Sequence, residues 1–334
     1  MRRLAALIVA LLLTVLPGHA AEDGKPTFFR IGNGSTAGTY YPIGGIIAAA
    51  ISNPPGGDDC AEGGACGVPG LLASAVATAG SVENVESIGK GALESGFAQA
   101  DVAHWAQTGT GNFSGLPAIG NLRAIASLYP EALHVVARAD AGIASLADLR
   151  GKRVSLDEPG SGTLVDARLV LDAAGLGDAD LTVMHLPATR AAAAMRAGDL
   201  DAFFFVGGYP APAVSRLAGQ TDVTLVPIDG EVAAALTGSS DFFLPEALPG
   251  GTYRGVDGDV QTLSVGALWV TSAEQPEDLI HAITRVLWND NTMRQLGFGH
   301  PIGHRIQREN ALKGVAIPLH PGAERYYREA GLLD

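Results

Sequence analysis

Three glycine-rich turns carry the residue types that suit binding of a small anion. The first is Gly32–Pro42, where glycine lets the backbone bend tightly and expose its N–H groups. An apolar run over residues 28–31 precedes it, and apolar residues at helical spacing follow over residues 43–51. The turn is therefore predicted to lead into a helix N-terminus, whose unpaired N–H groups favour a carboxylate or a phosphate. Its hydroxyl side chains are Ser35, Thr36, Thr39 and Tyr40.

Two other interpretations fit this first turn. One is a tight β–α connection that binds nothing. The other is dinucleotide binding, because Gly32, Gly34 and Ala37 nearly match the Rossmann fingerprint. That fingerprint needs an acidic residue at the end of a strand about twenty positions later, whereas residues 53–60 have the composition of a loop. The rest of the chain favours the capture of a small anion.

The second and third turns repeat the same arrangement. Residues 153–156 form a predicted strand, and a helical pattern covers residues 164–174 after the turn. The third turn follows an apolar strand over residues 201–206. Ligands of open α/β sheets bind beyond the carboxyl ends of the strands, so the turns are predicted to face one ligand. The second turn consists of Gly160, Ser161, Gly162 and Thr163, and the third contains Gly207, Gly208 and Tyr209, which either covers the ligand or is a surface aromatic residue.

Another strand followed by a helix start places two further polar residues near these turns. Gln99 ends a predicted strand, and Asp101 is predicted as the N-cap of a helix over residues 102–106. Both would project near the first turn if the strands are parallel neighbours. For Asp101, helix capping is favoured over direct contact with a ligand. Elsewhere the patterns predict a helix over residues 71–78 and a strand from residue 122 that breaks at Pro130.

The first twenty residues have the pattern of a secretory signal peptide. Arg2 and Arg3 precede an apolar run over residues 4–16, and small residues lead to a cleavage position after Ala20. The run is too short to span a bilayer, and no cysteine follows it to carry a lipid. We therefore expect an exported, periplasmic protein without a lipid anchor.

The cysteines, the histidines and the net charge indicate which cross-link, metal site and partners to expect. Export and an even count predict a disulfide between Cys60 and Cys66, which would stabilise the fold by about 2 kcal/mol. His300 and His304 lie in a Pro/Gly-rich loop, so no metal site is predicted. The net charge of −13 without a basic patch argues against nucleic acid as a partner.

Several of these segments together resemble the TAXI family, the extracytoplasmic solute receptors of TRAP (tripartite ATP-independent periplasmic) transporters. They are residues 32–45, 99–101, 145–163 and 320–331. The resemblance implies a type II periplasmic binding protein fold of class α/β, with two lobes, each a mostly parallel sheet flanked by helices, joined by two hinge strands. Residues 21–128 with 262–334 would form one lobe and residues 129–261 the other. Residues 122–138 and 263–270 are the candidates for the crossing strands.

The resemblance also implies a function. Family members capture small carboxylates, such as glutamate-like amino acids or 2-oxoglutarate, and deliver them to an integral-membrane TRAP permease. We therefore expect a monomeric receptor, neither an enzyme nor dependent on a cofactor. The first turn would bind one end of the ligand from one lobe, and the other turns would hold a carboxylate from the other lobe. Asp101 or Glu158 would meet an amine if the ligand has one, and Arg190 is expected to be a solvated helix residue.

Two alternatives share these sequence features. One is an exported sensor whose ligand-bound form signals to a membrane partner, which would have the same fold. The other is a hydrolase or a lyase acting on a small acid, which would need a nucleophile or a general base near the turns. The eight histidines are scattered and supply no such constellation.

Overall fold

The computed structural model describes residues 25–55 and 67–334. The predicted signal peptide and the predicted disulfide partners, Cys60 and Cys66, lie outside these residues. Within the described part of the chain, no helix has both the length and the apolar character needed to cross a membrane.

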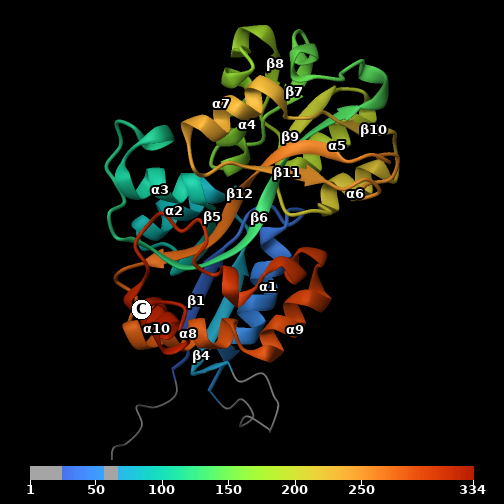
Figure 1. Cartoon of the computed structure of the whole chain (residues 1–334). Helices are drawn as coiled ribbons and strands as arrows, with labels where there is room; N and C mark the ends of the chain where they lie inside the picture. Colours follow the sequence, from blue (N-terminus) through green and yellow to red (C-terminus); the bar gives the residue numbers. More distant parts are fainter. Residues whose placement is uncertain (1–24, 56–66) are drawn as a thin grey trace, which may run out of the picture.

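Two long strands, β6 (Leu122–Arg138) and β12 (Val260–Ser272), form the centre of one continuous sheet. They pair antiparallel, and Figure 1 shows them running between two groups of helices and shorter strands, which we call the first and the second lobe. Strands of the first lobe join the sheet through β12. Those of the second lobe join through β6, except β11, which pairs with β12. The first-lobe strands are β1 (Thr27–Gly32), β2 (Ser52–Asn53), β3 (Val68–Pro69), β4 (Leu71–Val76) and β5 (Ser95–Gln99). The second-lobe strands are β7 (Arg153–Ser155), β8 (Thr182–Met184), β9 (Ala202–Gly207), β10 (Val223–Leu225) and β11 (Leu244–Leu248).

Helices flank each part of the sheet (Figure 1). Within each lobe the central strand pairs in parallel with its neighbours. In the first lobe β1 pairs with β4 and β5, and in the second lobe β7 pairs with β8 and β9. This arrangement confirms the predicted α/β architecture of two lobes and two hinge strands. The first lobe contains α1 (Tyr40–Ile51), α2 (Ser81–Gly89), α3 (Ala100–Thr108), α8 (Glu277–Leu287), α9 (Asp290–Gly299) and α10 (Pro321–Glu329). The second contains α4 (Gly162–Ala173), α5 (Ala188–Ala197), α6 (Pro212–Ala218) and α7 (Gly230–Ser239).

The expected break at Pro130 is wrong, because β6 continues through it. Pro130 pairs with Gly266 of β12, and the register of this ladder shifts just beyond Ala267. Proline has no N–H group to donate, so it is tolerated where the ladder is irregular. The proposed lobe boundaries, 128/129 and 261/262, fall within the two hinge strands and stay a prediction.

The predicted helix over residues 71–78 is also wrong. Residues 71–76 form β4, which pairs in parallel with β1 from Thr27↔Leu71 to Gly32↔Val76. Leucine and alanine favour helices locally, but pairing with β1 places this segment in the sheet, a tertiary effect that outweighs weak propensity.

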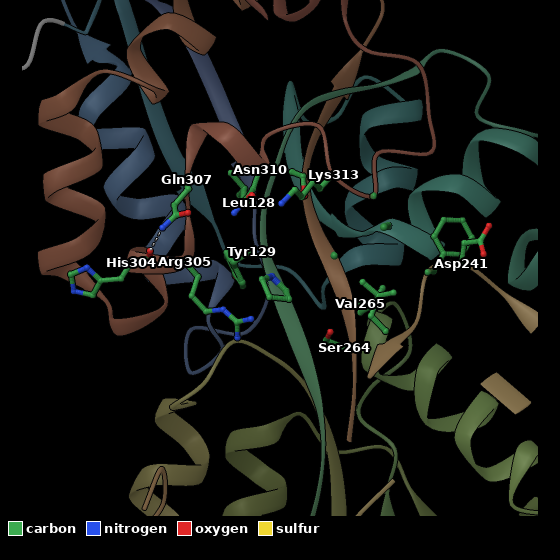
Figure 2. Close-up of a pocket in the computed structure, with 17 residues that line it drawn as sticks. Leu128, Tyr129, Asp241, Ser264, Val265, His304, Arg305, Gln307, Asn310 and Lys313 are labelled. Carbon is green, nitrogen blue, oxygen red and sulfur yellow. Dashed lines mark hydrogen bonds between the residues drawn. The ribbon is translucent and has the colours of Figure 1, made fainter. Parts of the chain in front are cut away.

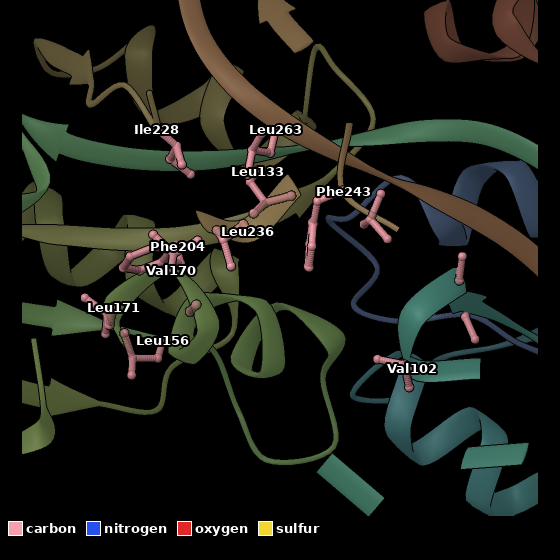
Figure 3. Close-up of a cluster of buried hydrophobic side chains, with 14 of the residues drawn as sticks. Val102, Leu133, Leu156, Val170, Leu171, Phe204, Ile228, Leu236, Phe243 and Leu263 are labelled. Atoms are coloured by element: carbon pink, nitrogen blue, oxygen red, sulfur yellow. The ribbon is translucent and has the colours of Figure 1, made fainter. Parts of the chain in front are cut away.

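Buried apolar side chains join the hinge strands to both lobes. Figure 3 shows Leu133 of β6 and Leu263 of β12 packed with Phe204 of β9 and with helix residues of the second lobe. Burying one such leucine or phenylalanine contributes about 1.5–3 kcal/mol. In the first lobe, Trp269 of β12 is fully buried, and its Nε1 donates to Ser95 Oγ at 3.1 Å. This contact holds β5, whose last residue is Gln99, against the hinge strand.

Candidate functional site

A cavity of about 50 Å³ lies where the predicted turns of the two lobes meet. One water molecule needs roughly 10–15 Å³ of such space, so the cavity can hold a small polar group. Residues at the first turns of α1, α2, α4 and α5 line it: Tyr40, Ser81, Gly162, Thr163 and Ala188. The convergence of helix N-termini gives the cavity a positive field and several N–H donors, which favours an anion.

The structure brings most of the predicted site residues to this cavity but leaves others outside it. Thr36 is exposed, and Asp101 is fully buried behind the cavity. Glu158 and Arg190 do not line the cavity either, and Arg190 is exposed. The binding roles of all these residues stay predictions. The predicted residues that line the cavity are Ser35, Thr39, Tyr40, Gln99, Ser161, Gly162 and Thr163, and those that do not are Thr36, Asp101, Gly160, Gly207, Gly208 and Tyr209.

The lobes are hydrogen-bonded to each other around the cavity, so this structure is a closed form. Gly208 N donates to Thr39 Oγ1 at 3.0 Å. Glu83 N donates to Gly160 O at 3.0 Å. Glycines 160 and 208 therefore contribute to contact between the lobes in this structure, although neither faces the cavity.

Two hydroxyls at the start of α4 already have backbone partners. Ser161 is the N-cap, and its Oγ accepts from Leu164 N at 3.1 Å. Thr163 Oγ1 accepts from Val206 N at 3.1 Å. A hydroxyl that accepts from the backbone still has its own proton to donate, so both groups can serve an anion in the cavity.

Two buried asparagines, Asn33 and Asn84, hold the first glycine-rich turn (Gly32–Pro42) in place. Asn84 Nδ2 donates to Asn33 O at 2.7 Å and to Phe97 O at 2.8 Å, which ties β1 and β5 to α2. A Cβ atom on Gly32 would lie 2.4 Å from Asn84 Oδ1, so this position requires glycine. Glycine at this position thus allows close packing of the strand against α2.

Tyr209 belongs to a polar contact between the lobes. Its hydroxyl donates to Glu246 Oε1 at 3.0 Å and accepts from Arg305 Nη1 at 2.9 Å. The guanidinium carbon also lies 5.5 Å from the centre of the Tyr209 ring. Arg305 follows α9 of the first lobe, whereas Tyr209 and Glu246 belong to the second lobe. Tyr209 is therefore neither a surface aromatic nor a cavity residue in this closed form.

Two carboxyl groups that the sequence patterns did not single out face the cavity. Glu131 of β6 is buried, and burial raises its pKa to about 8, although a hydrogen bond from Tyr40 opposes this shift. The Tyr40 hydroxyl donates to Glu131 Oε2 at 2.5 Å. Asp157, in the turn before α4, has a pKa raised to about 7, chiefly by burial. Both groups hold a proton more readily than an ordinary carboxyl group.

A further pair of buried acids lies beside the cavity. Asp101 of α3 and Asp166 of α4 are both fully buried. Burial raises both pKa values, and the neighbouring charge of Asp101 raises that of Asp166 further. The N-cap of α3 is Gln99, so the predicted capping role of Asp101 is wrong; its Oδ1 accepts from Val102 N at 2.7 Å within the first turn.

A larger cavity of about 430 Å³ shares no lining residue with the first one. Figure 2 shows Leu128 and Tyr129 of β6, Ser264 and Val265 of β12, and Lys313 around it. This cavity is larger than the first one. Among the described residues that line it, only Ala100 of α3 lies at the start of an α-helix. It lacks the converging N–H donors of the smaller cavity.

Sequence patterns missed residues that reach the site from distant segments. Glu131 lies in an apolar-looking strand. Ser81 directly follows Gly80, and this glycine before a helical pattern is the signal that could have found it. Asp157 was recognisable as a polar residue at the end of a predicted strand. Among residues 25–55 and 67–334, no group of three His, Cys, Asp or Glu side chains is arranged to hold a metal ion.

Several solved structures are similar to this chain over most of its length. A structure from Bordetella bronchiseptica RB50 aligns with a TM-score of 0.51 at 15% identity, covering 94% of this chain and 91% of that chain. The periplasmic aliphatic sulphonate binding protein SsuA from Escherichia coli aligns with a TM-score of 0.42 at 16% identity, over 91% of this chain and 79% of that one. The alkanesulfonate-binding protein SsuA from Xanthomonas axonopodis pv. citri, bound to MOPS, aligns with a TM-score of 0.44 at 16% identity, over 92% and 85%.

Comparison of the sequence with known protein families identifies the family of this chain. The model of the NMT1-like family matches residues 31–331, which include both hinge strands and all the turns that surround the cavity. The chain belongs to the NMT1-like family.

Proposed function

We propose that this protein is an exported solute receptor that closes around a small carboxylate and delivers it to a membrane permease. The ligand is a glutamate-like amino acid or a dicarboxylate such as 2-oxoglutarate, and the permease is of the TRAP type, as in the TAXI family. The mature receptor acts as a monomer in the periplasm.

One observation carries this proposal. The N-termini of α1, α2, α4 and α5 converge on a single cavity between two lobes that are bonded to each other. Helix N-termini bind carboxylates through backbone N–H groups and the helix dipole, without any arginine. A site divided between two lobes also explains how binding is communicated, because the ligand stabilises the closed form that a permease would recognise.

The proposal is tested by thermal unfolding of protein that has been unfolded and refolded to remove bound solutes. The panel contains glutamate, glutamine, 2-oxoglutarate, succinate, malate and acetate, with ethanesulfonate as a different anion for the same N–H donors. A ligand present at a hundred times its Kd adds about 2.7 kcal/mol of stability. We expect one or two five-carbon acids to stabilise the protein selectively.

Variants locate the binding site. Thr39→Val and Thr163→Val remove hydroxyls that line the smaller cavity, whereas Lys313→Ala alters the larger one. We expect the two valine variants to lose the stabilisation and the alanine variant to keep it. Loss of stabilisation only in Lys313→Ala would move the site to the larger cavity. A folded protein that no acid stabilises contradicts the proposal.

Two further experiments distinguish a transport receptor from a sensor and from an enzyme. The first identifies what the membrane partner does, and the second tests whether the ligand is converted. A receptor for transport restores uptake of its ligand when it is combined with permease subunits in vesicles, whereas a sensor changes the activity of a membrane signalling protein. A hydrolase or a lyase consumes the stabilising acid, which proton NMR of the mixture detects directly.

A further inference from the structure

The cavity between the lobes carries two acidic groups without a basic counterpart. Glu131 projects from hinge strand β6, and Asp157 precedes α4 of the second lobe. Among the described residues, none of those lining the cavity is lysine, arginine or histidine. Burying a carboxylate without an opposite charge is costly, so a partner of positive charge is expected to neutralise it.

Glu131 is only 2% exposed. The Tyr40 hydroxyl occupies its Oε2, while Oε1 receives no hydrogen bond from the described part of the protein. Tyr40 itself begins α1, so this pair lies beside a helix N-terminus of the first lobe. The free oxygen of Glu131 is thus available to a donor that enters the cavity.

Asp157 is held in an unusual backbone conformation. Its φ of 72° makes it the one non-glycine residue with a positive φ among residues 25–55 and 67–334. Such a conformation costs about 1–3 kcal/mol, persists only where surrounding structure imposes it, and is frequent at ligand-binding sites. Oδ1 accepts from Glu158 N at 2.8 Å, and the Thr163 hydroxyl also interacts with the carboxyl group. Two carboxylate oxygens together accept up to about four hydrogen bonds, so the group can still accept from a ligand.

We propose that Glu131 and Asp157 form a subsite for a protonated amine, so that the ligand carries an ammonium group as well as a carboxylate. An ammonium has three N–H donors, which suits sharing between a carboxylate on hinge strand β6 and one in the turn before α4. This inference rests on the proposed function, because it assigns the opposite end of the same ligand. It selects an amino acid over the corresponding keto acid or dicarboxylate.

The surroundings of the two acids favour a zwitterion over a metal cation. The N-termini of α1, α2 and α4 point at the same cavity and would repel a lone cation. Gln99 and the hydroxyls of Thr39 and Thr163 add polar groups that a carboxylate can use. A ligand with both charges satisfies the acidic groups and the N–H donors at once.

The test compares matched pairs of acids that differ only in the amine. The pairs are glutamate with glutarate, aspartate with succinate, and alanine with propanoate, titrated calorimetrically into the refolded protein. We expect an amine-bearing member to bind at least tenfold more tightly than its partner. Hydrogen bonds to charged groups contribute about 1.5–3 kcal/mol. Glu131→Gln and Asp157→Asn should therefore each weaken binding of the amine-bearing acid by roughly 10- to 100-fold. The partner without the amine should change by less than about threefold.

Both substitutions are mild, so a loss of binding can be separated from a loss of folding. Glutamine keeps the size of Glu131, and asparagine is among the residues that tolerate the positive φ found at position 157. Asp241→Asn is the matched control, since Asp241 is exposed and lines only the larger cavity. It should leave both members of each pair unchanged.

Three other outcomes overturn the inference. If acids without the amine bind as tightly as the amino acids, the subsite is wrong while the proposed function stands. If no acid binds to the folded protein, the proposed function fails as well. If sodium or potassium chloride stabilises the protein and Glu131→Gln removes that effect, the two carboxyl groups hold an inorganic cation instead.

Discussion

Gln99 and Asp166 join the two lobes by a buried hydrogen bond, in which Gln99 Nε2 donates to Asp166 Oδ2 at 2.7 Å. Asp101 of the first lobe lies beside Asp166 of the second, and both have raised pKa values because burial disfavours their charged forms. The closed arrangement therefore favours a proton on this pair of acids. Closure of the lobes and protonation are linked at this contact.

Replacing Asp166 by asparagine should stabilise the protein at about pH 8. The amide is neutral, and its oxygen and nitrogen can serve Gln99 and Asp101 respectively. No proton then has to be bound when the pair is buried. About 1 kcal/mol raises the unfolding midpoint of a chain of this size by about 2 °C, so we expect a rise of this order or more.

Thermal unfolding at about pH 5 and about pH 8 measures this effect. Asp172→Asn is the control, because Asp172 lies on the same helix and is exposed. It should leave the midpoint unchanged at both values. A midpoint of Asp166→Asn below that of the parent protein at the higher pH would show that the pair does not carry a proton.

Gly162→Ala should hinder closure of the lobes and weaken ligand binding by at least about tenfold, or about 1.4 kcal/mol. A Cβ atom at this position would lie 1.5 Å from Gln99 Oε1 and 2.7 Å from Ser81 Oγ, both in the opposite lobe. The open form has no such conflict, and alanine suits a helix better than glycine does.

Calorimetry with the acid that stabilises the parent protein gives the affinity, and small-angle X-ray scattering gives the degree of closure. Gly45→Ala is the matched control, since a Cβ atom there meets nothing within 4 Å. Unchanged affinity in Gly162→Ala, with scattering that still shows compaction by the ligand, would contradict the role assigned to this contact.

The stability of the unliganded protein should fall as the pH rises from about 6.5 to about 8. The folded-state pKa of Glu131 is about 8, above the ordinary value, so the folded state binds more protons than the unfolded state in this range. His134, whose pKa is lowered to about 4 by burial, has the opposite effect, which fades as the pH rises above about 6.5. Above that pH the contribution of the buried carboxyl groups remains.

Glu131→Gln should make this fall shallower, because it removes one of the carboxyl groups that must stay protonated. The titratable groups that interact with Glu131 are Tyr40, Tyr129, Asp101 and Asp166. Urea unfolding at half-unit steps of pH measures the slope for both proteins. Identical slopes would mean that Glu131 is already ionised in the folded protein.

Tyr209→Phe should weaken ligand binding by about two- to tenfold, the range expected for one hydrogen bond between neutral or partly charged groups. It removes the hydroxyl that links Glu246 and Arg305 across the lobes while keeping the ring under the guanidinium group. Calorimetric titration measures the change. Tyr41→Phe, in the first turn of α1, should bind as the parent protein does, and equal losses in both variants would argue against a specific closing contact.

Several features of the fold and of the site could be predicted from local sequence. The hinge strand candidates and the glycine turns before α1 and α4 are short-range patterns, in which a run of apolar residues ends at glycine and a helix begins. The turns also contain hydroxyl residues that line the cavity in the structure, such as Thr39 and Thr163. The same local reasoning gave the wrong secondary structure for β4, because pairing with β1, which is distant in sequence, makes this segment a strand.

Only the tertiary structure decided which polar groups face one another. Neighbouring residues of a strand point to opposite faces, so the register of β6 against β12 places Glu131 in the cavity and Pro130 beside the larger cavity. The approach of the two lobes buries Asp101 with Asp166 and leaves Thr36 in solvent. The sequence by itself determined the turns that can bind an anion, because those depend on backbone geometry within a few residues. The acidic side of the cavity depends on contacts between segments far apart in the chain, which is why only the folded structure reveals it.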